Sequence, residues 1–165
     1  MVGEKPMARS LKSMTALFFS VGFGLMVVLT PMASGDDTKN EAGIKATLKA
    51  KDAKADGTQE VTITLEIPSP YHLYANPVGH EDLESVQTKV TVTGKSKPKD
   101  VKVEYPKGKL VIDALVGNHS VYEGKVVIPL KLVRADKEEL TVQIKYQACD
   151  DKKCLPPATM KLTLK

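Results

Sequence analysis

The chain has 165 residues, of which 42% are hydrophobic and 27% are charged, and this balance excludes an intrinsically disordered protein. The net charge is only +4, and basic and acidic residues are interleaved along the chain, so the sequence predicts no nucleic acid partner. Two cysteines in the whole sequence exclude a disulfide-dense scaffold and a four-cysteine zinc site.

Residues 1–35 have the pattern of a secretory signal peptide. Three basic residues precede an uncharged, largely apolar run from Ser13 to Ser34, which ends with small side chains where signal peptidase cuts. We expect cleavage before Asp36. Because the apolar run is long for a signal peptide, the alternative is an uncleaved N-terminal anchor. Both alternatives export the domain, to the periplasm or an equivalent compartment, and it meets a membrane only if the segment is not cleaved.

Residues 36–42 are polar and predict a short flexible leader before a domain of residues 43–165. In this domain apolar and polar residues alternate with a period of two, which indicates half-buried strands. The alternating segments are 44–50, 61–67, 90–92, 101–103, 140–146 and 160–164. The apolar segment 126–133 predicts a central strand, in which Pro129 indicates a bulge or an unpaired backbone position.

Turn residues separate these segments, and only residues 80–86 suggest a helical turn. Eight or nine short strands at this spacing predict an all-β domain with an immunoglobulin-like antiparallel β-sandwich fold. Paired carboxylates, a Ser-His-Asp arrangement and a glycine-rich phosphate loop do not occur, so hydrolases and nucleotide-dependent enzymes have no support.

Cys149 and Cys154 flank four polar residues, 150–153, near the C-terminus. If these four residues form a hairpin loop, the cysteines face each other with Cα atoms about 4.5 Å apart, within disulfide range. A disulfide that closes so short a ring adds about 2 kcal/mol at most on the chain-entropy estimate. The spacing alone leaves a structural staple and a redox-active pair as equal alternatives.

The segment Tyr146-Gln147-Ala148-Cys149 followed by Cys154-Leu155-Pro156-Pro157 resembles the active-site hairpin of a known family, the N-terminal periplasmic domain of DsbD-type thiol:disulfide interchange proteins. Tyr71-His72-Leu73-Tyr74 and Val121-Tyr122-Glu123-Gly124 resemble two further stretches of that family, in the same order. The resemblance covers about residues 60–165.

This resemblance implies an immunoglobulin-like domain that relays two electrons by exchange at Cys149 and Cys154, with Cys154 attacking first. The family's membrane domain and thioredoxin-like domain are not part of this sequence. The implied partners are therefore separate proteins, namely thioredoxin-fold proteins and a membrane electron donor. The rival class of function is a non-catalytic exported binding or assembly module with a structural disulfide.

The resemblance also implies a cap loop over the cysteines, at residues 113–117. Asp113 matches the acidic residue of the family's cap, and Leu115 replaces its usual Phe. Two supporting residues are implied beside the cysteines. Tyr74 matches a family Tyr and His72 replaces another.

The three histidines allow two further hypotheses. A protonated His72 beside Cys149 would lower the pKa of its thiol. His72 and His119 with the two cysteines would make four tetrahedral ligands for zinc or copper, but their spacing matches no metal motif. We therefore expect no metal and no cofactor, and we expect His80 and His119 to be ordinary loop residues.

Overall fold

The computed structural model describes residues 40–135 and 138–165. The predicted signal peptide and most of the predicted leader thus lie outside the described residues. The described chain forms eleven β-strands and one 3-10 turn, η1 (Glu81–Leu83), which lies in the segment predicted to contain a helical turn. Within those two ranges no helix is long and apolar enough to cross a membrane.

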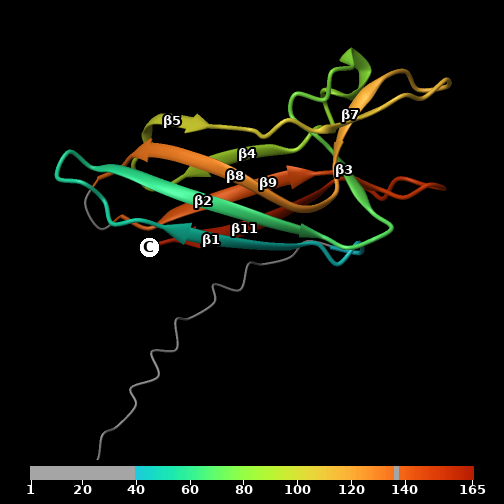
Figure 1. The fold of residues 1–165 in the computed structure, drawn as a ribbon. Coiled ribbons are helices and arrows are strands. Elements are labelled where there is room, and N and C mark those ends of the chain that lie inside the picture. Colours follow the sequence, from blue (N-terminus) through green and yellow to red (C-terminus); the bar gives the residue numbers. More distant parts are fainter. Residues whose placement is uncertain (1–39, 136–137) are drawn as a thin grey trace, which may run out of the picture. The chain divides into compact units, whose positions relative to one another are not determined.

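One layer is a four-stranded antiparallel sheet (Figure 1). Its strands, in spatial order, are β1 (Lys45–Ala50), β2 (Thr58–Ile67), β8 (Gly124–Val133) and β5 (Lys99–Val103). The facing layer is a three-stranded antiparallel sheet of β11 (Ala158–Leu164), β9 (Leu140–Tyr146) and β4 (Lys89–Thr93). The predicted all-β antiparallel fold is confirmed.

The two layers enclose one apolar core, because alternate residues of each strand point inward. Each fully buried Val, Leu or Ile side chain contributes about 1.5–3 kcal/mol, so the alternating pattern dominates the choice of register. The core contains Val61, Ile63, Leu65, Ile128, Leu130 and Leu132 from the first layer and Leu140, Val142, Ile144, Met160, Leu162 and Leu164 from the second.

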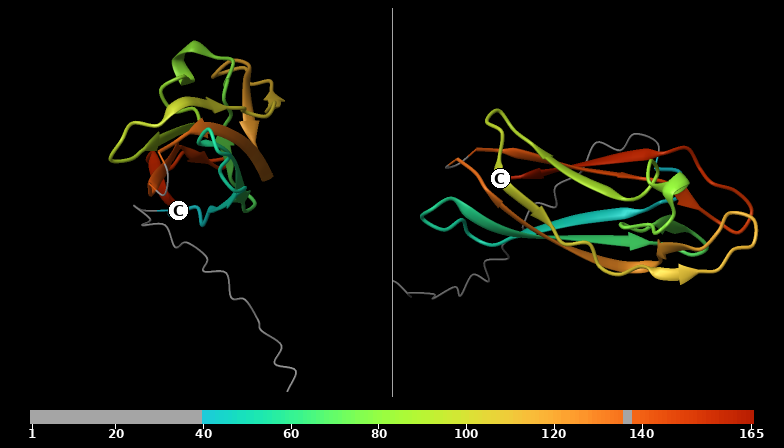
Figure 2. Two further views of the ribbon diagram at one scale, coloured as in Figure 1. Left: turned by 90° about the vertical axis from the view of Figure 1, so that its left-hand side faces the viewer. Right: turned by 90° about the horizontal axis from the view of Figure 1, so that it is seen from above.

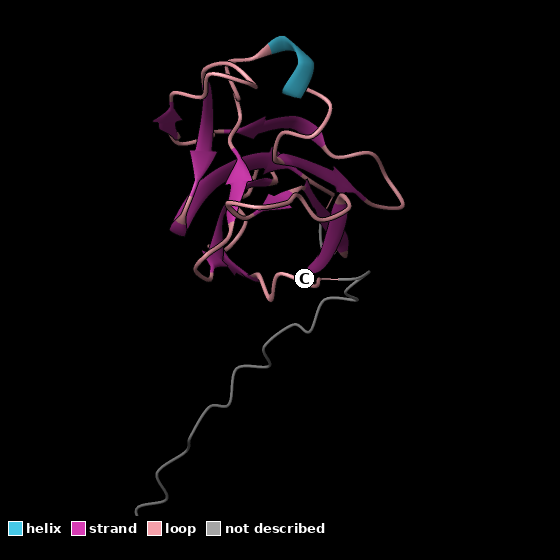
Figure 3. Cartoon of the chain, turned by 90° about the vertical axis from the view of Figure 1, so that its right-hand side faces the viewer, coloured by secondary structure: helices cyan, strands magenta, loops and turns pink. Residues whose placement is uncertain are grey.

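A second four-stranded sheet forms at one end of the sandwich and carries the cysteines. It consists of β10 (Ala148–Cys149), β3 (His72–Tyr74), β7 (His119–Tyr122) and β6 (Lys109–Val111). Figure 2 (right) shows the cysteine hairpin and the loop before β7 reaching out at the same end, and Figure 3 looks onto that end. Strand β7 leads into β8 through Gly124, whose φ of +61° suits glycine.

Pro129 lies inside β8, where it pairs with Thr62 of β2. Its carbonyl oxygen accepts a hydrogen bond of 2.9 Å from the N–H of Glu104, just after the end of β5. The missing proline N–H therefore interrupts little of the ladder, because β5 has already ended. The register irregularity lies instead in β5, between Lys99 and Lys102.

The first described residues lie within the predicted leader. The Oδ1 atom of Asn40 accepts hydrogen bonds from the N–H of Ile44 at 2.9 Å and from the Tyr146 hydroxyl at 3.0 Å. Ala42 is buried. Residues 40–42 therefore pack on the sandwich, because the Asn40 amide is hydrogen-bonded to Tyr146 of β9, 106 positions away.

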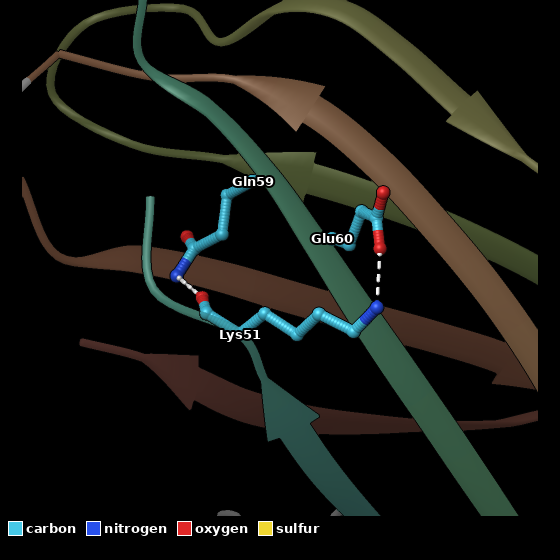
Figure 4. Close-up of polar contacts among 3 residues, drawn as sticks. All are labelled: Lys51, Gln59 and Glu60. Atoms are coloured by element: carbon cyan, nitrogen blue, oxygen red, sulfur yellow. Dashed lines mark hydrogen bonds and ion pairs between the residues drawn. The ribbon is translucent and has the colours of Figure 1, made fainter. Parts of the chain in front are cut away.

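The opposite end of the sandwich is closed by polar contacts between β2 and the segment after β1 (Figure 4). Gln59 donates from Nε2 to the carbonyl oxygen of Lys51 at 2.8 Å, and Lys51 Nζ lies 2.7 Å from Glu60 Oε2. The ion pair is exposed and adds little stability. These contacts lie away from the cysteine end.

Candidate functional site

Cys149 and Cys154 form a disulfide across a tight turn, as their spacing in the sequence predicts. Their Cα atoms are 3.9 Å apart and the two residues form an antiparallel bridge. Asp150 holds the turn, because its Oδ1 atom accepts hydrogen bonds from the N–H groups of Lys152 and Lys153 at 2.8 and 2.9 Å. These bonds favour the carboxylate and lower the pKa of Asp150. Asp150 is thus part of the turn structure.

The two sulfur-bearing residues differ in exposure. Cys149 is only 3% exposed and packs in a small apolar cluster with Tyr74, Val78 and Val121, whereas Cys154 is exposed. A thiolate or disulfide that approaches from solvent therefore meets Cys154 first. Cys149 is protected from direct attack while the hairpin stays folded.

His72 is the residue that pairs with Cys149 between β3 and β10. Partial burial lowers the pKa of His72, against the opposing effect of Glu123 and the hairpin aspartates. Burial thus favours the neutral imidazole. Burial therefore opposes a positive charge on His72, and its role beside Cys149 stays a prediction.

Tyr74 brings a hydroxyl group to the exposed cysteine. Its Oη atom lies 3.7 Å from Sγ of Cys154, and since a disulfide sulfur carries no proton, the phenol is the donor. Burial raises the pKa of Tyr74, and the negative charge of Asp113 adds to this effect. The phenol therefore keeps its proton near neutral pH and can stabilise a thiolate formed at Cys154.

The predicted cap loop, residues 113–117, is a turn held by its own hydrogen bonds. Asp113 Oδ1 accepts from the N–H groups of Leu115 and Val116 at 2.7 and 2.9 Å, and these bonds lower the pKa of Asp113. Gly117 closes the turn with a φ of +96°, and a Cβ atom there would lie 2.6 Å from Nε2 of His80. Glycine is needed at this position for both reasons.

Leu115 is 97% exposed and covers neither sulfur in this structure. The sequence resemblance placed this side chain over the cysteines. The difference follows from the loop, because its hydrogen bonds are internal and do not require Leu115 to pack on the disulfide. Leu110, Ile112 and Val116 are exposed as well, so aliphatic side chains gather in this one segment.

His119 is not the loop residue that the sequence suggested. It begins β7 and is only 6% exposed, with Nδ1 2.9 Å from the carbonyl oxygen of Gly117 and its ring in edge contact with Tyr74. The period of two counted back from Val121 was the available signal, because it places His119 on the inward face of a strand. His80 also lies at the cap loop, against Gly117.

In the part of the chain that the structure describes, no three His, Cys, Asp or Glu side chains form a cluster that could hold a metal ion. Both cysteines are in the disulfide and offer no thiolate. The four-ligand site considered for His72, His119 and the cysteines is therefore not formed in this oxidation state.

The family model described as "Thiol:disulfide interchange protein DsbD, N-terminal" matches residues 44–165. The chain belongs to this family. The match includes both cysteines, Tyr74, His72 and the cap loop, and it confirms the resemblance seen in the sequence. Among curated proteins none matches the chain significantly.

Two solved structures share the fold. The N-terminal periplasmic domain of ScsB from Proteus mirabilis is 19% identical, with a TM-score of 0.60 over 79% of this chain and 51% of that chain. The chain thus spans about half the length of the ScsB structure. In the complex between the DsbD N-terminal and PilB N-terminal domains from Neisseria meningitidis, the matching chain is 17% identical, with a TM-score of 0.51 over 76% of this chain and 85% of that chain.

Proposed function

We propose that this domain exchanges disulfides with exported proteins and relays two electrons from a thioredoxin-like donor to oxidised partners. The observation that carries the proposal is the asymmetric disulfide, with Cys154 exposed beside a protonated phenol and Cys149 buried behind it. Redox-active cysteines combine accessibility with groups that stabilise the thiolate.

The asymmetry supports an order of attack. In the reduced domain, the Cys154 thiolate attacks a disulfide of the partner, a mixed disulfide forms, and the partner's second sulfur leaves as a thiolate that takes up a proton. The Cys149 thiolate then attacks Cys154 Sγ, which forms the intramolecular disulfide and releases the partner with two thiols. Two electrons pass to the partner, and a reduced donor restores the domain by the reverse steps.

Two neighbouring side chains support these steps. The Tyr74 hydroxyl donates toward Cys154 and stabilises its thiolate. Neutral His72 lies across the strand pair from Cys149 and accepts the thiol proton when Cys149 becomes the second nucleophile. The order of attack and both roles belong to the proposal.

The cap loop and β6 supply the surface for the partner. Among the described residues six large hydrophobic side chains are exposed, and four of them are Leu110, Ile112, Leu115 and Val116. Such a concentration beside a reactive group marks a protein contact. The DsbD N-terminal domain of Neisseria meningitidis forms a complex with the PilB N-terminal domain. We infer that thioredoxin-fold proteins and a separate membrane electron donor dock here after export.

A measured reduction potential tests this function against a structural disulfide. The protein is equilibrated with glutathione buffers, and the reduced fraction is determined by thiol modification. We expect a potential above about −300 mV, the range of labile disulfides. A value below this limit contradicts exchange and supports a binding module with a structural disulfide.

A further inference from the structure

His119 is a buried polar side chain that the proposed exchange steps do not use. In the described chain it is one of four buried polar residues, the others being Thr58, Gln59 and Thr88. A buried imidazole is costly unless its nitrogen atoms find partners. Its contacts therefore indicate what the residue does.

The first contact anchors the ring. Nδ1 of His119 lies 2.9 Å from the carbonyl oxygen of Gly117, and because a carbonyl only accepts, Nδ1 carries the proton. Gly117 is itself held by its N–H bond to the carbonyl oxygen of Asp113 at 3.0 Å. The imidazole is thereby fixed to a turn that has its own hydrogen bonds.

The second contact is made by the ring itself. The His119 and Tyr74 rings meet edge to face, with centroids 5.6 Å apart and an angle of 63° between their planes. Tyr74 pairs with Val121 between β3 and β7, so His119 is its diagonal neighbour two residues away on the same face. Aromatic pairs of this geometry restrict the ring that they contact.

The backbone of Tyr74 is held from another side. Its carbonyl oxygen accepts hydrogen bonds from the N–H of Thr88 at 2.9 Å and from the Thr88 hydroxyl at 2.7 Å. The ring packs on Cys149, Val78 and Val121, and its hydroxyl lies 3.7 Å from Cys154 Sγ. His119 contacts that ring directly.

We propose that His119 is a positioning residue, whose ring, anchored on Gly117, holds the Tyr74 hydroxyl against Cys154. The inference rests on the proposed exchange at Cys154. It gives a role to His119, which the proposed exchange steps do not use. His119 itself does not touch the reacting sulfur atoms. Its effect on Cys154 passes through Tyr74.

A double-mutant cycle tests this dependence. In a Cys149→Ala background, Cys154 is the single thiol, and its rate of alkylation by iodoacetamide near neutral pH reports the reactivity of its thiolate. His119→Asn can keep a donor toward Gly117 but removes the ring, and we expect it to slow alkylation about threefold to tenfold, the effect of one hydrogen bond. In the presence of Tyr74→Phe the same substitution should change the rate by less than about twofold. The proposal is overturned if His119→Asn slows alkylation by the same factor with Tyr74 and with Tyr74→Phe, or if it does not slow alkylation at all.

Two further variants separate the ring from the anchor. His119→Phe keeps a ring against Tyr74 and loses the bond to Gly117, so we expect it to slow alkylation less than His119→Asn does. A larger effect of His119→Phe contradicts positioning by the ring. His80→Asn, a matched histidine change on Gly117, should leave the rate unchanged. A slowing equal to that of His119→Asn would show that loosening the loop is sufficient, and would overturn the proposal.

Thermal unfolding confirms that each variant is folded. If His119→Asn does not fold, the cycle is measured with His119→Phe, whose effect must also disappear with Tyr74→Phe. The assay uses a small reagent and no partner protein. Failure to trap a partner would therefore contradict the proposed function and leave the coupling of His119 and Tyr74 as measured.

Discussion

The hydroxyl oxygen of Tyr74 lies 3.7 Å from Sγ of Cys154, although the two residues are 80 positions apart in the chain. Strand β3 places Tyr74 beside the hairpin, because it pairs with β10 on one side and with β7 on the other. The contact joins a phenol that keeps its proton to the exposed cysteine of the pair. Reactivity at Cys154 therefore depends on a residue outside the hairpin.

Tyr74→Phe removes the hydroxyl and keeps the ring. We expect alkylation of Cys154 in the reduced protein to slow about threefold to tenfold near neutral pH, because the thiolate loses a hydrogen-bond donor. The pH at which alkylation reaches half of its maximum should rise. Tyr71→Phe is the matched control, since Tyr71 packs on the main core, and it should change neither quantity. Equal profiles for wild type and Tyr74→Phe would show that the hydroxyl does not act on Cys154.

Single cysteine substitutions should differ in the partners that they trap. Cys149→Ala leaves the exposed Cys154 without its resolving thiol, so a mixed disulfide with a thioredoxin-fold protein should accumulate on a non-reducing gel after expression in the exported compartment. Cys154→Ala leaves the buried Cys149 and should trap several-fold less. The double variant should trap nothing and remain folded, because the six-residue ring adds about 2 kcal/mol at most. Equal trapping by both single variants contradicts the order of attack.

Leu115→Ala should leave the rate of disulfide reduction by dithiothreitol within about twofold of wild type, because a side chain that is 97% exposed shields nothing that its removal uncovers. The same position should matter for the partner. Leu115→Asp places a charge on the exposed aliphatic segment and should reduce trapping of a partner by Cys149→Ala. Faster reduction of Leu115→Ala would instead show that Leu115 covers the disulfide in solution.

Gly117→Ala should lower the free energy of unfolding by about 1–3 kcal/mol, because it combines an unfavourable φ with a Cβ atom 2.6 Å from His80 Nε2. Gly124→Ala is the matched control, with a φ of +61° and no atom within 4 Å of the added Cβ. Gly124→Ala should lower the free energy of unfolding, measured in urea, by less than Gly117→Ala does, since only the backbone strain applies. Combining Gly117→Ala with His80→Ala should restore part of the lost free energy of unfolding, because the clash with the His80 ring is removed. If nothing is restored, the whole loss comes from backbone strain at residue 117.

Stability should fall in mildly acidic solution through His72. Its pKa in the folded state is lowered from the ordinary value of 6.5, so below that pH the unfolded chain binds a proton that the folded domain resists. Between about pH 7.5 and about pH 5.5, urea unfolding should show a larger loss for wild type than for His72→Gln. Asp113 and Asp150 do not contribute in this window. Because their pKa values are lowered from the ordinary 3.8, the stability that their carboxylates add is lost only as the pH falls below about 3.8. An identical loss in both proteins would show that His72 is not the group responsible.

The strands and the cysteine hairpin were predictable from the sequence because their causes are local. Residues that alternate with a period of two, such as Val61, Ile63 and Leu65, must face one side of a strand, and their burial sets the register. Four polar residues between Cys149 and Cys154 suffice for a turn, which brings the two cysteines together. These features depend on neighbours within a few positions.

The surroundings of the hairpin depend on how distant strands pair, and only the tertiary structure decides them. Tyr74 reaches Cys154 because β3 pairs with β10, and Asn40 reaches Tyr146 because residues 40–42 pack on β9. No local pattern encodes either contact. Burial is likewise a property of the assembled sheets. It lowers the pKa of His72 and makes His119 an inward-facing ring, while the internal bonds of residues 113–117 leave Leu115 in solvent.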